Sequence, residues 1–156
     1  MDAFALLQSY MDVVAAAVMQ GDWPTYEAHV SLPFHLVTQT ADMTVTTQTD
    51  LRAGFDDFRE TLKLQRITDL IQLVETASRL DHDRISGQYV THLLASGHRV
   101  IAPYRSSITL RLIGNQWRAV SIANSLANAR WPITVPKLAE AQDQISDAQL
   151  LRKDQK

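Results

Sequence analysis

The chain has 156 residues, of which 46% are hydrophobic and 21% charged, with a formal net charge of −2 and no cysteine. These values are typical of one globular domain with a sizeable core, and they exclude disulfides and thiolate metal sites. The apolar runs are broken by charges and the N-terminus has no basic leader, so we expect no membrane span and no signal peptide. A cytoplasmic location is predicted.

Charge is unevenly distributed along the chain. Acidic side chains outnumber basic ones in residues 1–83, whereas residues 84–139 contain six Arg, one Lys and no Asp or Glu. A basic patch can mark a nucleic acid or an anionic ligand. Because Lys is nearly absent there and no nucleic-acid motif is present, we favour basic strands that face acidic helices, within one fold or across a dimer. No nucleic-acid partner is expected.

The first segment predicts an amphipathic helix whose apolar side chains recur at intervals of three and four, namely Phe4, Leu7, Met11, Val14 and Val18. Gly21 suits the left-handed position that ends a helix. Asp22, directly before Trp23 and Pro24, is a predicted cap for a second, short helix from about residue 23 to residue 30.

A strand is predicted to start at Pro33, where a missing N–H is tolerated. Residues 33–48 predict a hairpin that turns at Ala41 and Asp42. Thr49 is then the expected N-cap of a third helix. The apolar stripe of that helix is Leu51, Phe55, Phe58 and Leu62.

Four longer strands are predicted at about 68–80, 84–95, 99–112 and 116–126, and short turns between them indicate an antiparallel meander. Ile108, Leu110 and Leu112 share one face of their strand. Alternation in the last strand places Val120 and Ile122 opposite Trp117 and Ala119. A sheet that is apolar on both sides needs two covers, so we expect helices on one face and a homodimer through the other.

The end of the chain predicts a separate unit. Pro136 opens a predicted helix over residues 136–152 with a thin apolar stripe. We therefore divide the chain into a domain at 1–130 and a C-terminal helical tail at 131–156.

Four stretches resemble the nuclear transport factor 2-like superfamily, in particular its SnoaL-like members. They are GDWPTY after the first helix, LPF at the first strand, TDLRAGFDDF in the third helix and GNQWRAVSI at the last hairpin. The resemblance covers roughly residues 3–126. It implies an α+β fold in which a cone-shaped, curved antiparallel sheet packs on three N-terminal helices around a cavity, followed here by the C-terminal helix. It implies no single activity, because one fold hosts many functions.

Isomerase-like members of that superfamily use a sheet carboxylate, a Tyr and a protonated acid. Tyr10 matches the tyrosine by type and location, whereas the first strand offers His35 in place of the carboxylate. His92 and Glu75 are further catalytic candidates, because a histidine titrates near neutrality and a buried carboxyl group has a raised pKa. A site with His35, His92 and either Tyr10 or Tyr26 would suit a dehydratase. The alternative places both histidines at the surface and Glu75 in solvent or beside a strand Arg.

Aromatic residues are the candidate lining of an apolar ligand site, with core and rim packing as the alternative. They are Trp23, Tyr26, Phe34, Phe55, Phe58, Tyr104 and Trp117. Arg105 and Arg111 share one strand face and either clamp a carboxylate inside or face outward, which we favour.

No metal or cofactor is predicted, since the five His show no metal-binding spacing. The leading functional hypothesis is a pocket for a small, largely apolar ligand with no established reaction. The alternatives are a cyclase, dehydratase or isomerase that acts by His, Tyr or Glu acid–base chemistry, and a dimeric protein-interaction module.

Overall fold

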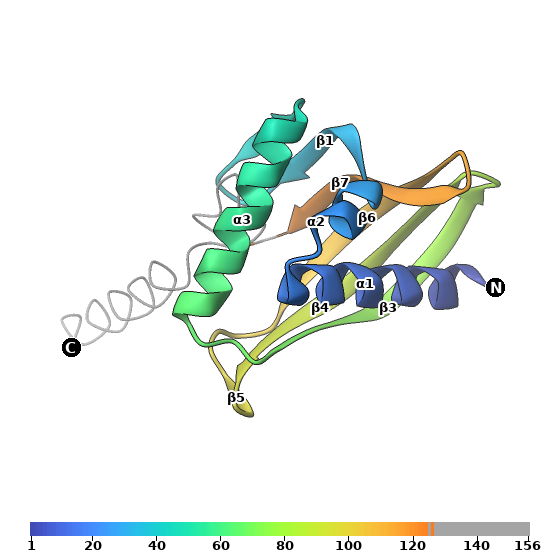
Figure 1. The fold of residues 1–156 in the computed structure, drawn as a ribbon. Coiled ribbons are helices and arrows are strands. Elements are labelled where there is room, and N and C mark those ends of the chain that lie inside the picture. Colours follow the sequence, from blue (N-terminus) through green and yellow to red (C-terminus); the bar gives the residue numbers. More distant parts are fainter. Residues whose placement is uncertain (125, 127–156) are drawn as a thin grey trace, which may run out of the picture.

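A computed structural model describes residues 1–124 and 126, which form a curved, unclosed sheet with helices on one side (Figure 1). The helices are α1 (Ala3–Gln20), α2 (Trp23–Ala28) and α3 (Gln48–Leu64). The strands are β1 (Val30–Val37), β2 (Asp42–Val45), β3 (Asp69–Asp81), β4 (Arg84–Ala95), β5 (His98–Arg99), β6 (Tyr104–Ile113) and β7 (Gln116–Asn124). The predicted α+β cone fold is confirmed, while the predicted helix at 136–152 lies outside the described residues.

The sheet has the order β2-β1-β7-β6-β4-β3, with β5 paired to β4. The four-strand meander predicted from the turns is present as β3, β4, β6 and β7, all antiparallel. One neighbour pair departs from the antiparallel prediction, because β1 runs parallel to β7. The first strand of the chain thus joins the last one, β7, inside the sheet.

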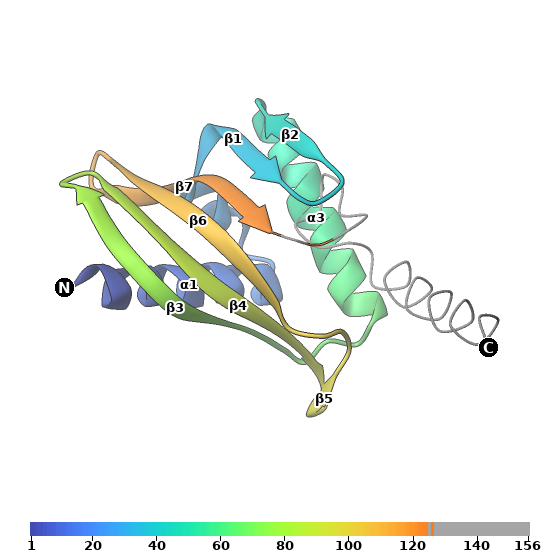
Figure 2. The ribbon, with the colours of Figure 1, turned by 180° about the vertical axis from the view of Figure 1, so that it is seen from behind.

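The three helices lie on the inner face of the curved sheet. Helix α1 crosses β3 and β4, and α3 lies on the side of β1 and β2 (Figure 1). From behind, the strands are seen without a described helix over them, so this second surface is the outer face (Figure 2). Side chains along β4 point alternately to the inner and the outer face. Ile85, Tyr89 and Leu93 are the buried ones on the inner face.

A close contact seats α1 on the sheet. Leu7 is completely buried, and a methyl group on Gly87 of β4 would collide with its side chain and come within 2.6 Å of the Thr76 carbonyl oxygen. Gln8 accepts a hydrogen bond from the Val74 N–H at 2.8 Å and donates one to the Gln72 carbonyl at 2.8 Å. The pairing of β3 with β4 shifts just after Val74, so the glutamine holds the backbone of the strand at this irregularity.

The predicted end of the first helix is confirmed by its geometry. Gly21 has φ of 75°, in the left-handed region. Asp22 accepts a hydrogen bond from the Thr25 N–H and begins α2. The other boundaries are displaced by two residues: α2 ends at Ala28, and the N-cap of α3 is Thr47 rather than Thr49.

Three strand predictions need correction. Strand β1 starts at Val30, and Pro33 falls in a stretch where the pairing with β7 shifts, so its missing N–H does not interrupt the ladder. Strand β6 starts at Tyr104, directly after Pro103. Val120 is an extra residue in β7, and this bulge returns Ile122 to the inner face, where it pairs with Ile108.

Helix α1 is long and apolar enough to cross a membrane by length and composition alone. In the structure one side of it packs into the main hydrophobic cluster through Leu7, Tyr10 and Met11. Core helices of globular domains pass the same test. The absence of a membrane span and a cytoplasmic location both stay predictions.

We expect Gly87→Ala to lower the free energy of unfolding by about 1–3 kcal/mol, because the added methyl group overpacks the contact between α1 and β4. Urea denaturation of this variant and of Ser86→Ala, whose side chain is next to it on the other face, would measure the effect. Equal stability of the two variants would contradict the proposed close seating of α1.

Candidate functional site

A small cavity lies between the helices and the inner face of the sheet. It has a free volume of about 50 Å³, which is room for a water molecule but well below the ~300–1,000 Å³ of typical ligand sites. Its walls come from all three helices and from the strands between them. Most lining residues are aliphatic or aromatic, including Met11, Val14, Phe34, Phe58, Ile108 and Ile122.

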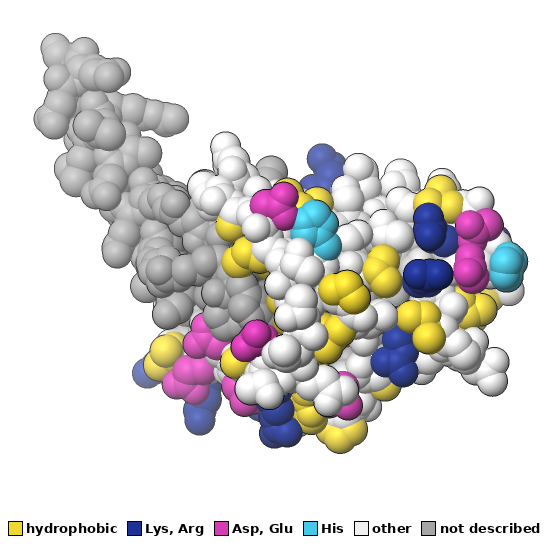
Figure 3. All heavy atoms as spheres, turned by 90° about the horizontal axis from the view of Figure 1, so that it is seen from above, with side chains coloured by type: hydrophobic (Ala, Val, Ile, Leu, Met, Phe, Trp, Pro, Cys, Tyr) yellow, Lys and Arg dark blue, Asp and Glu magenta, His cyan; other side chains and the backbone are white. Residues whose placement is uncertain are grey.

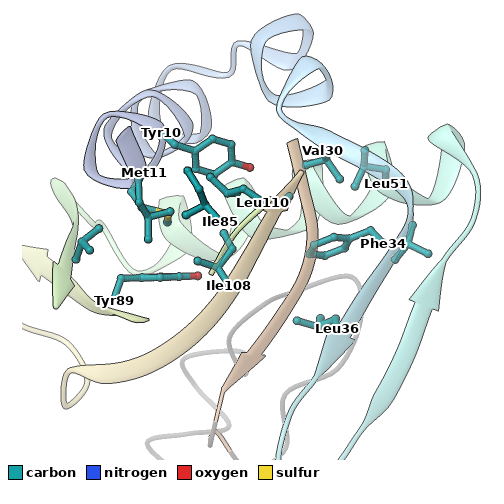
Figure 4. Close-up of a cluster of buried hydrophobic side chains, with 14 residues drawn as sticks. Tyr10, Met11, Val30, Phe34, Leu36, Leu51, Ile85, Tyr89, Ile108 and Leu110 are labelled. Carbon is teal, nitrogen blue, oxygen red and sulfur yellow. The ribbon is translucent and has the colours of Figure 1, made fainter. Parts of the chain in front are cut away.

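The polar groups of this cavity are three tyrosines and one amide. They are Tyr10, Tyr26, Tyr89 and Gln72. Figure 4 shows Tyr10 on α1 and Tyr89 on β4 reaching into the same cluster of aliphatic side chains. No Asp, Glu, His, Lys or Arg is among the described residues that line the cavity, so the site is neutral and offers hydroxyl and amide groups.

The tyrosine hydroxyls differ in their hydrogen bonding. The Tyr10 hydroxyl donates to the His29 carbonyl oxygen at 2.5 Å and thereby ties α1 to the start of β1. The Tyr89 hydroxyl lies near the side chain of Ser106, its partner residue on β6, which acts to lower the pKa of the phenol. Within the described part of the chain the Tyr26 hydroxyl has no hydrogen-bond partner. Tyr26 is thus the polar group most available to a guest in the cavity.

Burial raises the pKa of every one of these phenols. The pKa of Tyr26 rises from 10.0 to about 12, because the charged form would lose its solvation. The pKa values of Tyr10, Tyr89 and the nearby Tyr104 are also raised, in each case mainly by burial. All four tyrosines are therefore neutral hydrogen-bond donors at physiological pH.

The predicted ligand-binding aromatics occupy different places in the structure. Tyr26, Phe34 and Phe58 line the cavity. Trp23 and Phe55 pack their rings against Tyr26 in tilted contacts. The Tyr26 and Phe55 ring centroids are 4.9 Å apart.

Two further aromatics from that prediction do not line the cavity. Tyr104 is buried beside Thr91, its partner residue on β4. Trp117 packs at the edge of the core, with the Arg79 guanidinium 5.7 Å from its ring centre.

The predicted catalytic residues are not brought together. His35 lies on the outer face and bonds Asp42 in the β1–β2 hairpin. His92 is on the outer face of β4, where it contacts Arg99. Strands β7 and β6 separate the two histidines, a distance of about 14 Å across the sheet. Neither histidine reaches Tyr10, which is on the inner face.

Glu75 is also outside the cavity. It forms a bidentate ion pair with Arg105, with contacts of 2.5 and 3.1 Å. This hydrogen bonding and the arginine charge lower the pKa of Glu75, so the carboxyl group is ionised near neutrality. The alternative prediction, that Glu75 lies beside an arginine on a strand, is confirmed, and that arginine is Arg105. Arg105 and Arg111 both face outward, as favoured from the sequence.

Sequence analysis overlooked two polar residues of the cavity, Gln72 and Tyr89. Both alternate with outward residues on β3 and β4, and their inward direction follows from the buried side chains two positions away, Leu70 and Thr91. That period of two was visible in the sequence. The sequence did not show which of the two faces of each strand turns toward the helices.

Solved structures with the same fold were found despite low sequence identity. An NTF2-like protein from Cytophaga hutchinsonii aligns with a TM-score of 0.56 at 15% identity, over 80% of this chain and 98% of that one. An NTF-2-like protein of unknown function from Shewanella oneidensis gives 0.55 at 10% identity, over 75% and 93%. A domain of unknown function with a cystatin-like fold from Nostoc punctiforme gives 0.58 at 12% identity, over 96% of both chains.

These likenesses establish the nuclear transport factor 2-like fold of the chain, and the resemblance inferred from the sequence is confirmed at that level. A scan against protein-family models found no match. A search of curated proteins found none either. The similar structures therefore show the fold alone, and the function has to be argued from the site.

We expect the folded protein to show almost no tyrosinate absorbance at pH 10, since all four tyrosines have raised pKa values. The unfolded chain binds fewer protons than the folded one above pH 10, so the free energy of unfolding should fall as pH rises from 10 through 12. Spectrophotometric titration with and without denaturant would test this. Titration of any tyrosine near pH 10 in the folded protein would contradict the burial.

Proposed function

We propose that the chain binds a small, largely apolar molecule that carries a neutral hydrogen-bond acceptor such as a carbonyl group. The observation that carries this proposal is the Tyr26 hydroxyl, which has no hydrogen-bond partner among the described residues, in an uncharged and mostly apolar lining. The Tyr26 side chain is half-buried and its hydroxyl is accessible, so a guest carbonyl could accept its hydrogen bond. The apolar walls would supply most of the binding free energy.

The cavity has to widen for such a guest, because its free volume is about 50 Å³. Phe58 on α3 is a partly buried wall residue, and Met11 on α1 is an unbranched side chain that changes rotamer readily. Movement of these two side chains would enlarge the space without disturbing the seat of α1 at Gly87. Acid–base catalysis is not favoured, since the described lining has no carboxylate and no histidine.

Tyr26→Phe should weaken binding of a cyclic ketone by about three- to tenfold, the effect of one neutral hydrogen bond. Thermal-shift screening of ketones, hydrophobic acids and polyketide-like compounds would identify the probe, and calorimetry would give the affinities. Tyr104→Phe is the matched control, because it removes a buried hydroxyl that does not line the cavity.

The proposal fails if no compound stabilises the protein and Phe58→Ala, which enlarges the cavity, also binds none. It fails equally if Tyr26→Phe and Tyr104→Phe weaken binding to the same extent. In that case the hydroxyl acts through stability and not through the guest.

We further propose a homodimer through the outer face of the sheet. Ile71 and Leu73 of β3 are 39% and 50% exposed there, and Leu73 pairs with the partly buried Val90 on β4. Exposed apolar side chains on a sheet face favour association with a second apolar surface. The Glu75–Arg105 pair lies on the same face and adds a polar contact.

Leu73→Asp should convert the dimer to a monomer, because the new carboxylate would have to be buried in the interface. Light scattering after size exclusion would measure the mass. Leu64→Asp is the control, since Leu64 is 72% exposed at the end of α3. A monomeric wild-type protein at tens of micromolar would refute the dimer.

A further inference from the structure

Arg118 of β7 is a cation whose surroundings in the structure do not satisfy it. Its Nε atom is buried and has no hydrogen-bond partner. One terminal nitrogen reaches the carbonyl oxygens of Glu27 and Val30, each at 3.4 Å. Those contacts are at the long limit of a hydrogen bond. The guanidinium thus touches the end of α2 without making strong bonds.

No described carboxylate neutralises this cation. The ion pairs in residues 1–124 join His35 with Asp42, Arg52 with Asp56, and Arg105 with Glu75, and none reaches Arg118 within 4.0 Å. A buried donor of a charged group that lacks a partner carries a substantial desolvation cost. The retained charge therefore points to an acceptor that comes from outside the described chain.

The strand register adds a second cation. Arg118 pairs directly with Arg111 of β6, and Arg111 pairs with Arg84 of β4. Like charges opposite each other on neighbouring strands destabilise a sheet. Arg84 has Asp81 opposite it in the β3–β4 hairpin, whereas the strand partner of Arg118 is another cation, and the Arg118 side chain extends toward the backbone of α2 and β1. Figure 3 shows basic side chains together with acidic and histidine side chains at the end of the molecule away from the grey residues.

Arg118 lies in the wall of a cleft of about 420 Å³, which is separate from the inner cavity and falls in the usual range of ligand sites. The cleft is bounded by α2, the start of β1, the N-terminal turn of α3 and the end of β6. Its polar wall includes Ser31 and Gln48, and its apolar wall includes Leu51 and Ile113. The positive end of the α3 dipole lies at Gln48, whereas Asp50 in the same turn and the carbonyl end of α2 contribute negative potential.

We infer that this cleft binds a monocarboxylate with a small apolar body. A carboxylate in the cleft would accept hydrogen bonds from the terminal nitrogens of the guanidinium, which, unlike Nε, are not enclosed without a partner. The apolar body would pack on Leu51 and Ile113. Glu27 also borders the cleft, so a single negative charge is favoured over a dianion such as phosphate. This site does not depend on the inner cavity or its guest.

Phenylacetate is a suitable probe, with phenylacetamide as its neutral counterpart. In ¹⁵N spectra of the full chain, we expect a saturable shift of the Arg118 Nε–H signal with phenylacetate and none with phenylacetamide. Arg118→Gln should weaken phenylacetate binding by about tenfold or more, the effect of losing a charged hydrogen-bonded pair. Glu27→Gln should strengthen it by about two- to threefold.

Arg99→Gln is the matched control, since Arg99 is exposed on β5 and outside the cleft, and it should leave the affinity unchanged. Arg118→Lys assigns the signal and keeps the charge if Arg118→Gln does not fold. The inference is overturned if phenylacetate gives no saturable shift, or if phenylacetamide binds equally well. It is also overturned if inorganic phosphate binds and phenylacetate does not, because the site then selects charge alone.

Discussion

The contact between α1 and the inner face of the sheet is the constraint on which the rest of the structure depends. Gly87 leaves room for the completely buried Leu7, and Gln8 holds the backbone of β3 beside an irregularity in its pairing. With α1 fixed so close to β3 and β4, the remaining helices can only cover the other part of the concave face. The small cavity is what remains between them.

This arrangement determines the chemistry of the interior. Ionisable carboxylates, histidines and arginines are kept out of the described cavity lining, and its polar groups are neutral phenols and an amide. Such groups stay uncharged because burial raises the pKa of each tyrosine. A neutral interior suits recognition of an apolar molecule with one acceptor better than it suits proton transfer.

Charged side chains instead gather on the outside of the sheet. The basic segment was expected to face acidic helices, within one fold or across a dimer. Within the described residues of one chain, its ion pair joins two strands instead, through Arg105 and Glu75. Arg111 and Arg118 are strand partners on β6 and β7, and neither forms an ion pair among the described residues. The same sequence asymmetry therefore yields a satisfied pair at one place and an unsatisfied cation in a cleft at another.

The sequence by itself determined the helices, the meander and the cap at Asp22, because periodicity and capping are local properties of the chain. It also limited the candidates for chemistry to a few His, Tyr and Glu side chains. Only the tertiary structure decided which face of each strand turns toward the helices. The bulge at Val120 reversed the alternation in β7. Packing of the helices on one face left His35 on the outer face of β1 and placed Tyr26 of α2 at the inner cavity. These outcomes depend on contacts between residues far apart in the chain, which no local pattern contains.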